Sequence, residues 1–323
     1  MTTDAHHDGL PSFDELPELE NIGVRHAWDV WGRDDELGSI NLVTPSRVAR
    51  AATLVRTGEV ISLDLPLDQP NPPLFGRKAY EHHVFALNRN EMDDRLDGFH
   101  LQASTQWDAL CHVRAREHGY WGGRHQDPTE GPNGLGIDRW AEHGIAGRGV
   151  LIDLDAWRAG LRSAGAEGGY DALQPHAFSA ADVQAALDAQ GTTLLPGDIL
   201  CLRFGWTTAY RGLDAAGRVA YAEGPTFAGL RAGQDEARFI WNAHPAALCA
   251  DNPAVEVVPG DASVGSLHRR LLPTLGMALG EMFDFDTLAQ RCGALGRYEF
   301  FFVAAPLKVP NGLGSPGNAV AIL

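Results

Sequence analysis

Short, nearly uninterrupted apolar runs set the strongest limit on how this chain of 323 residues can fold. A run of this length that starts at a glycine is typical of a strand buried on both faces. We therefore expect strands at residues 147–154, 197–205, 246–250 and 300–307. Segments with helical patterns separate them, so the chain is predicted to form an α/β fold.

Capping residues indicate where the helices begin. Apolar residues at helical spacing predict a helix over residues 45–56, with Thr44 or Ser46 as its cap. The stretch Ser179-Ala-Ala-Asp182 starts a second helix, and residues 281–292 read as a short third one.

The first third of the chain adds two strands and a loop. Residues 60–65 and 80–88 read as strands, and the four prolines within 66–78 predict an extended loop that could border a pocket. Residues 1–24 are polar and acidic and are expected to form a flexible, loosely held N-terminal arm. Strands and helices alternate too irregularly for a barrel of eight units, so we expect one α/β domain over residues 25–323.

Charge and cysteine content exclude several classes of partner. The chain has 26 basic and 42 acidic residues, a net charge of −16, which argues against binding to nucleic acid or to an anionic membrane. No apolar run reaches the roughly 20 residues of a membrane span, and no secretory signal is visible. The widely spaced Cys111, Cys201, Cys249 and Cys292 read as reduced core thiols. We expect a cytoplasmic protein that binds a small molecule.

The segment Gln102-Ala-Ser-Thr-Gln106-Trp-Asp108-Ala-Leu-Cys-His112 is unusually polar for a stretch that also carries apolar residues. If residues 102–108 are extended, Gln102, Gln106 and Asp108 lie on one side of a strand. His112 follows Asp108 by four residues, the spacing of neighbours on one face of a helix. Burying such a stripe is costly unless its members bind each other, a ligand or a metal, so we predict a site here.

This segment resembles the signature of the cyclase family, which includes bacterial kynurenine formamidase and isatin hydrolase. That signature reads His-x-Gly-Thr-His-x-Asp-x-Pro-x-His, and this chain keeps Thr105, Asp108 and His112. It is similar to a branch with a Gln-Trp-Asp variant, in which Gln102 and Gln106 stand where the signature has metal-binding histidines. The resemblance runs from Trp31 to Pro316 and implies a swivelling β/β/α domain.

The resemblance also implies the second half of a metal site. In the formamidases a histidine and a glutamate about a dozen residues later complete it, and His268 and Glu281 match that order. A metal would then be bound by Asp108, His268 and Glu281 with an amide oxygen from Gln106 or Gln102. The alternative is a surface histidine at 268 and a helix cap at Glu281.

The donor set predicts the metal. Two carboxylates, one imidazole and amide oxygens are harder than a histidine-rich set, which favours manganese over zinc. Fewer imidazoles also weaken affinity, so the site could hold no metal. The glutamines would then form a hydrogen-bonded network that positions Asp108 and the substrate.

Among the candidate catalytic residues, His112 is assigned general acid/base work, because histidine takes and gives protons near neutral pH and the family uses this position so. It could instead only hydrogen-bond Asp108. Trp107, Tyr120 and Trp121 could line a flat substrate pocket with Gln102, although such aromatics are often core residues. The stretch Asp251-Asn252-Pro253 reads either as a catalytic loop or as a strand-ending turn.

Three functions follow. The first is a metal-dependent hydrolase of a small amide, lactam or lactone, in which the metal polarises the carbonyl and activates water. The second is a biosynthetic cyclase, dehydratase or lyase that uses the same pocket without a hydrolytic metal. The third is a catalytically inactive binding protein, suggested by the loss of two histidines.

Assembly into a homodimer or homotetramer is implied by the resemblance. The run Phe300-Phe-Phe-Val-Ala-Ala305 would expose apolar surface if it formed an edge strand, and a two-fold contact would bury it. The alternative is that this run is a central strand.

Overall fold

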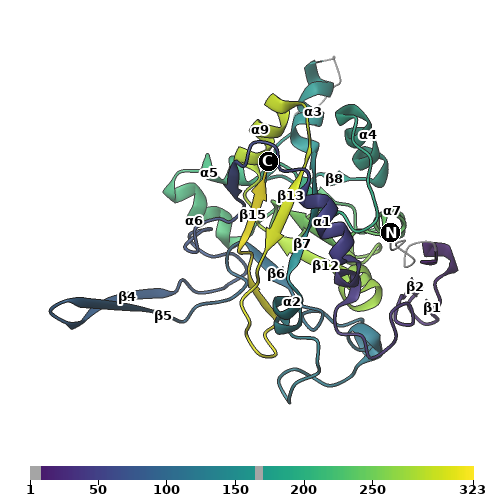
Figure 1. Cartoon of the computed structure of the whole chain (residues 1–323), viewed down its shortest axis with the longest axis horizontal. Helices are drawn as coiled ribbons and strands as arrows, with labels where there is room; N and C mark the ends of the chain where they lie inside the picture. Colours follow the sequence, from purple (N-terminus) through teal and green to yellow (C-terminus); the bar gives the residue numbers. More distant parts are fainter. Residues whose placement is uncertain (1–8, 164–169) are drawn as a thin grey trace.

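The computed structural model describes residues 9–163 and 170–323, and its centre is a mixed nine-stranded sheet (Figure 1). Within these residues the strand order is β14-β6-β12-β11-β9-β7-β13-β15-β3. In chain order the strands are β3 (Val60–Ser62), β6 (Gln106–Asp108), β7 (Ile145–Asp153), β9 (Ile199–Arg203), β11 (Ala247–Ala250), β12 (Ala278–Glu281), β13 (Glu299–Ala304), β14 (Gly314–Pro316) and β15 (Ala319–Ile322).

Four parallel strands, β12, β11, β9 and β7, form the middle of the sheet. Strands β9, β11 and β12 are buried at every position, as continuous apolar runs in parallel strands require. On one side β6 runs antiparallel to both β12 and β14, and on the other β13 runs antiparallel to β7. The predicted strands at 147–154, 197–205 and 246–250 are confirmed.

The phenylalanine run belongs to β13, which lies between β7 and β15 rather than at an edge. Phe300 and Phe302 are fully buried, while Phe301 and Val303 on the other face are half-buried. The alternative of a central strand is therefore confirmed, and the run offers no exposed edge for assembly.

Nine α-helices in the described ranges pack around the sheet. They are α1 (Pro45–Ala52), α2 (Ile137–His143), α3 (Leu154–Ser163), α4 (Ala180–Gln190), α5 (Trp206–Arg211), α6 (Ala215–Glu223), α7 (Gln234–Ala243), α8 (Leu267–Arg270) and α9 (Asp286–Leu295). Short 3-10 or π turns are η1 (Phe13–Glu15), η2 (Gly38–Leu42), η3 (Arg116–His118), η4 (Trp121–Gly123) and η5 (Leu271–Leu275). None of the helices in these ranges is long and apolar enough to cross a membrane.

Two predicted helix starts are confirmed. Thr44 caps α1 by accepting a hydrogen bond from the Arg47 amide, and Ser179 forms a capping box with Asp182 at the start of α4. The helix predicted over 281–292 was wrong at its beginning. Glu281 ends strand β12, and α9 starts only at Asp286, so Glu281 is not a helix cap.

Residues 9–24 of the predicted flexible arm pack against the body of the protein. Phe13 is 2% exposed, and its amide donates to Asn242 Oδ1 over 2.8 Å. The Trp241 indole donates to the Pro11 carbonyl over 2.8 Å, so this segment is held on α7. Strand β1 (Glu18–Leu19) then pairs with β2 (Val24–Arg25). Residues 1–8 of the predicted arm lie outside the described residues.

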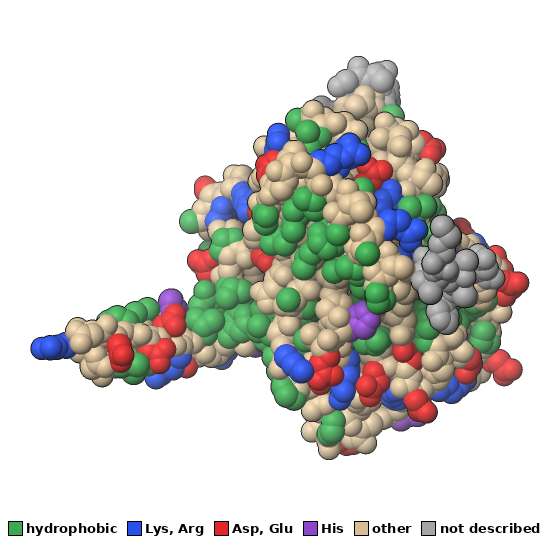
Figure 2. All heavy atoms as spheres, in the orientation of Figure 1, with side chains coloured by type: hydrophobic (Ala, Val, Ile, Leu, Met, Phe, Trp, Pro, Cys, Tyr) green, Lys and Arg blue, Asp and Glu red, His purple; other side chains and the backbone are tan. Residues whose placement is uncertain are grey.

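Strands β4 (Glu81–Asn88) and β5 (Glu91–Asp97) form an antiparallel hairpin that projects from the body (Figure 1). The strand predicted at 80–88 is confirmed, but it pairs with β5 outside the main sheet. Figure 2 shows apolar and charged side chains intermingled along this projection. Val84, Leu87 and Met92 are 58–65% exposed. A small parallel pair, β8 (Ala177–Phe178) and β10 (Gly229–Leu230), lies elsewhere.

Candidate metal centre

Strand pairing brings the two halves of the predicted site together. In the antiparallel register of β6 and β12, Glu281 is the partner of Gln106 and Leu279 is the partner of Asp108. Gln106 and Asp108 are two residues apart on β6, so their side chains leave the same face of the strand. The Gln106 amide donates to Glu281 Oε2 over 2.6 Å.

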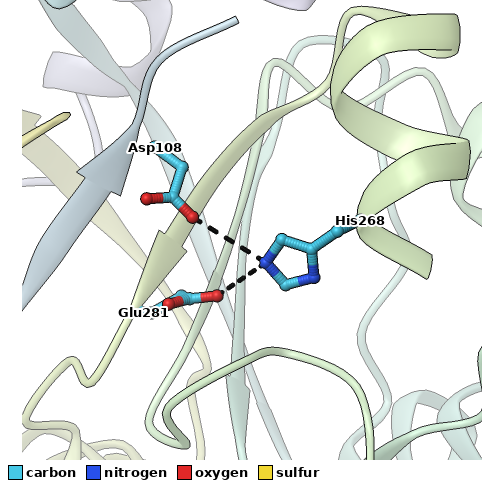
Figure 3. A group of neighbouring side chains, drawn as sticks. All are labelled: Asp108, His268 and Glu281. Atoms are coloured by element: carbon cyan, nitrogen blue, oxygen red, sulfur yellow. Dashed lines mark hydrogen bonds and ion pairs between the residues drawn. The ribbon is translucent and has the colours of Figure 1, made fainter. Parts of the chain in front are cut away.

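His268 reaches the same place from helix α8 (Figure 3). Its Nε2 atom lies 2.8 Å from Glu281 Oε1 and 3.7 Å from Asp108 Oδ2. One ligand atom from each of these three residues lies within 4.8 Å of the other two. His268 has only 13% of its side chain exposed, so it is not a surface histidine.

Two oxygens in this cluster are buried and have no hydrogen-bond partner among the described residues. They are Asp108 Oδ2 and Gln106 Oε1. Leaving such a group unpaired costs about 1–3 kcal/mol, and more when it is charged. A divalent cation would satisfy both, because carboxylate, imidazole and amide atoms are suitable ligands. Ligands held at about 2.1 Å from one ion lie roughly 3 Å apart, and the three ligand atoms here lie within 4.8 Å of one another. The residues therefore fit a divalent metal.

The charges in the cluster depend on each other. Burial raises the pKa of Asp108, but His112, His268 and Gln102 more than offset this and lower that pKa below its usual value. Burial and the adjacent Asp108 carboxylate raise the pKa of Glu281 to about 7. Burial lowers the pKa of His268, but the neighbouring carboxylates, first that of Asp108, raise it well above its usual value. Two carboxylates thus surround one imidazole in a site that is largely shielded from solvent.

Gln102 and His112 complete the site on the other side of Asp108. Gln102 Nε2 donates to Asp108 Oδ1 over 2.5 Å and lies 3.1 Å from His112 Nδ1. His112 Nε2 lies 3.8 Å from Asp108 Oδ2. With 29% of its side chain exposed, His112 is reachable from solvent while Asp108, at 1%, is not.

The local backbone around these residues differs from the prediction. Only residues 106–108 are in the sheet, and His112 lies in a turn rather than a helix. Thr105, the residue before β6, is held through its side chain: Oγ1 donates to the Met282 carbonyl over 2.6 Å and accepts from the Leu65 amide.

The three aromatic residues predicted to bind substrate are buried in the core. Trp107 is 0% exposed, stands against Phe283 and donates its indole proton to the Gly317 carbonyl. It leaves β6 on the face opposite Gln106 and Asp108, as alternation requires. Trp121 is also fully buried and donates to Asp35 Oδ2.

Tyr120, which is 5% exposed, lies under the Arg114 guanidinium. Together, these contacts assign the three aromatics packing roles.

Sequence reasoning missed Glu256, which lies 3.1 Å from His268 Nδ1 through its Oε1 atom. Burial raises the pKa of Glu256, but its hydrogen bonds, first that with His268, lower it below its usual value. A signal was present, because Glu256 is a single carboxylate within the apolar run Ala254-Val-Glu-Val-Val258. Such a residue is rarely buried unless it is paired.

Asp251 proved to be structural. Its carboxylate is buried and accepts hydrogen bonds from the amides of Phe204, Gly205 and Trp206. Burial, with part of its effect offset by Arg203, raises the pKa of Asp251 to about 7. The prediction of a strand-ending turn is the one that fits these contacts.

Comparisons with known proteins agree with the fold and the motif. A family model described as "Putative cyclase" matches residues 51–257. A crystal structure described as a novel cyclase is 31% identical, with a TM-score of 0.81, and the match covers 98% of this chain and 100% of that one. No curated protein matches the chain.

Two isatin hydrolases share the fold at lower identity. Isatin hydrolase A from Labrenzia aggregata, bound to benzyl benzoate, has a TM-score of 0.58 at 17% identity, over 84% of this chain and 94% of its own. Isatin hydrolase A from Ralstonia solanacearum has a TM-score of 0.58 at 16% identity, over 86% and 98%. The predicted α/β cyclase-like fold is confirmed, and the chain belongs to the cyclase family.

Proposed function

We propose that this protein hydrolyses a small amide, lactam or lactone with the help of a divalent metal held by Asp108, His268 and Glu281. One observation carries the proposal: Asp108 Oδ2 and Gln106 Oε1 are buried without hydrogen-bond partners in the described part of the chain, beside two further side chains that could bind a metal. Membership of the cyclase family, and a fold shared with isatin hydrolases, support it.

Each residue of the centre has a defined role. Asp108, Glu281 and His268 supply the charged and imidazole ligands, and Gln106 offers its free amide oxygen. Because three of these four donors are oxygens, the set suits manganese better than a histidine-rich set would. The bound metal supplies Lewis-acid polarisation of the carbonyl and activation of water.

Proton transfer is assigned to His112. Its ring is partly exposed and lies within 4 Å of Asp108, so it can meet a substrate that approaches the metal ligands. Gln102 fixes Asp108 through a 2.5 Å hydrogen bond and stands next to His112. His112 would deliver a proton to the leaving nitrogen or oxygen.

The test uses protein purified without chelator. Elemental analysis should find manganese or zinc. In a mass-spectrometric screen, lactams and lactones should yield ring-opened products heavier by one water, and open-chain aryl amides should yield an acid and an amine. Asp108→Asn should lose both metal and activity. The partly exposed Asp127→Asn serves as the control and should keep them. If protein free of transition metal keeps its activity in strong chelator, the proposal of a metal-dependent reaction is refuted.

The Gln102 contacts favour a second candidate. The hydrogen bonds that join Gln102, Asp108 and His112 form an acid/base group that needs no cation. A cyclase, dehydratase or lyase could use it directly. A product of unchanged mass, or one lighter by a water, would identify this chemistry.

We also propose that the protein is cytoplasmic and works as a homodimer or homotetramer. All four cysteines are buried free thiols, which is typical of proteins from reducing compartments. The β4–β5 hairpin supports assembly, because an isolated two-stranded hairpin is only marginally stable in water. A second copy of the chain would cover its exposed apolar side chains.

A further inference from the structure

Both ring nitrogens of His268 have a carboxylate partner, and the two carboxylates come from different segments of the chain. Nε2 lies 2.8 Å from Glu281 Oε1 in the metal cluster, while Nδ1 lies 3.1 Å from Glu256 Oε1 on the other edge of the ring. A ring that donates its Nδ1 proton to a carboxylate keeps the Nε2 lone pair free for a cation. Glu256 therefore stands where it decides which nitrogen is the ligand.

The Glu256 carboxylate is itself fixed by the start of helix α8, which carries His268. Ser266 Oγ donates to Oε1 over 2.9 Å, and the Leu267 amide donates to Oε2. Both oxygens are thus engaged by residues adjacent to His268 in sequence. Rotation of the carboxylate away from the ring would leave these donors without their acceptor.

The backbone at Glu256 is also immobilised. Asn252, which is 0% exposed, donates from Nδ2 to the Ala228 carbonyl over 2.7 Å and to the Val255 carbonyl over 3.3 Å. A Cβ atom at Gly229 would collide with the Glu256 carbonyl group, so the close approach of the two segments requires glycine there. These contacts hold the loop that presents Glu256.

We propose that Glu256 is a positioning residue of the metal centre, which orients His268 and selects Nε2 as its ligand atom. This inference rests on the proposed function only in taking His268 as a metal ligand. The turn after β11, which contains Asn252, then serves to hold Glu256 in place behind the histidine.

Replacing the carboxylate by an amide tests the charge without changing the shape. In Glu256→Gln the new NH₂ group must face either His268 Nδ1 or the Leu267 amide, and both are donors in the wild-type arrangement. The amide also loses the negative charge that favours the ring orientation. Loss of such an outer partner weakens metal binding by about 10–100-fold.

The experiment measures zinc affinity of metal-stripped protein by competition titration, for wild type, Glu256→Gln and Glu256→Ala. Glu236→Gln is the matched control, because Glu236 is also a buried glutamate but accepts from the Gly233 and Ala180 amides instead. We expect both Glu256 variants to lose about 10–100-fold in affinity and the control to match wild type.

Nitrogen-15 NMR of the histidine rings in the zinc-loaded proteins gives a second readout that a purely structural role would not move. Wild type should show a protonated Nδ1 and a zinc-bound Nε2 at His268, and Glu256→Ala should show a mixture. If Glu256→Ala fails to fold, the isosteric Glu256→Gln decides.

Folded variants with wild-type affinity and an unchanged ring spectrum would overturn the proposal, as would a wild type that binds no zinc. A wild type that binds zinc through His268 but hydrolyses no substrate would remove the proposed function and leave this inference intact.

Discussion

The side-chain amide of Gln106 donates to Glu281 Oε2 over 2.6 Å, while its own oxygen stays buried without a partner among the described residues. The two residues are 175 positions apart in the chain and are brought together as register partners on β6 and β12. In the proposed metal centre, Gln106 would orient the Glu281 carboxylate with its nitrogen and leave its oxygen for the metal. Its chemistry should decide which ion the site prefers.

Substituting Gln106→His should shift the metal preference toward zinc. An imidazole in place of the amide oxygen makes the donor set softer, so the ratio of zinc to manganese affinity should rise by about tenfold or more. Competition titrations with both metals measure this ratio. Gln126→His, at an exposed position, controls for the mere addition of a histidine. An unchanged ratio would show that Gln106 is not a ligand.

Removing the His112 ring should lower turnover but spare metal binding. Loss of a general acid/base typically costs about 10²–10⁴-fold in rate. Once a substrate is found, kcat of His112→Ala should fall in that range, with metal content equal to that of wild type. His143→Ala, at an exposed position, is the control. Wild-type turnover in His112→Ala would leave only the hydrogen-bonding role with Asp108.

A pH-dependent loss of stability should come from Asp64. Burial raises the pKa of this carboxyl to about 6, and its Oδ1 atom has no hydrogen-bond partner within residues 9–163 and 170–323. The folded protein therefore retains a proton that the unfolded chain releases from about pH 4 upward. This raised pKa therefore does not weaken the folded protein below about pH 4, where Asp64 is protonated in both states. The free energy of unfolding falls by about 2–3 kcal/mol as pH rises from there to about 6.

Asp64→Asn should abolish this loss. Urea unfolding of wild type and variant at pH 4 and pH 7 gives the difference between their free energies of unfolding, which should favour the variant more at pH 7. The exposed Asp34→Asn should show no such change. A difference that does not vary with pH would refute the assignment to Asp64.

Light scattering at micromolar concentration should give a multiple of the 34.8 kDa chain mass. Val84→Asp combined with Met92→Asp places charges on one face of the β4–β5 hairpin and should shift the mass toward the monomer. Val219→Asp, at a similarly exposed apolar position on α6, should leave assembly unchanged. A wild-type mass near that of one chain would end the proposal of a homo-oligomer.

The central strands could be predicted because each one can be identified from its own local sequence, without knowledge of its neighbouring strands. Continuous apolar runs specify burial on both faces, and β7, β9 and β11 lie where such runs occur. Which strands become neighbours depends on contacts between distant segments. Nothing local distinguishes β13 as an interior strand from an edge strand, so the position of Phe300 in the sheet was not predictable from its own sequence.

The site residues also divide into those that could be predicted from the sequence and those that could not. Asp108, Gln106, His268 and Glu281 were predicted from a resemblance in their order along the chain, and the structure brings them together. Trp107 could have been left out of the site, because alternation along β6 places it on the face opposite Gln106 and Asp108. Glu256 escaped because its partner, His268, is twelve positions away on another element.

The assembly of the site from β6 and β12 has a consequence for folding. One segment supplies Asp108 and Gln106, and the other supplies Glu281 with His268 before it, so neither holds more than two of the four donors. Gln106 and Glu281 are 175 positions apart, and closing a loop of this length carries an entropy cost that must be met before the contacts form. In the proposed metal centre, a chain still incomplete on the ribosome would offer the cation no more than two donors. The metal would bind only to the nearly complete fold, where it would link two distant segments and slow their separation.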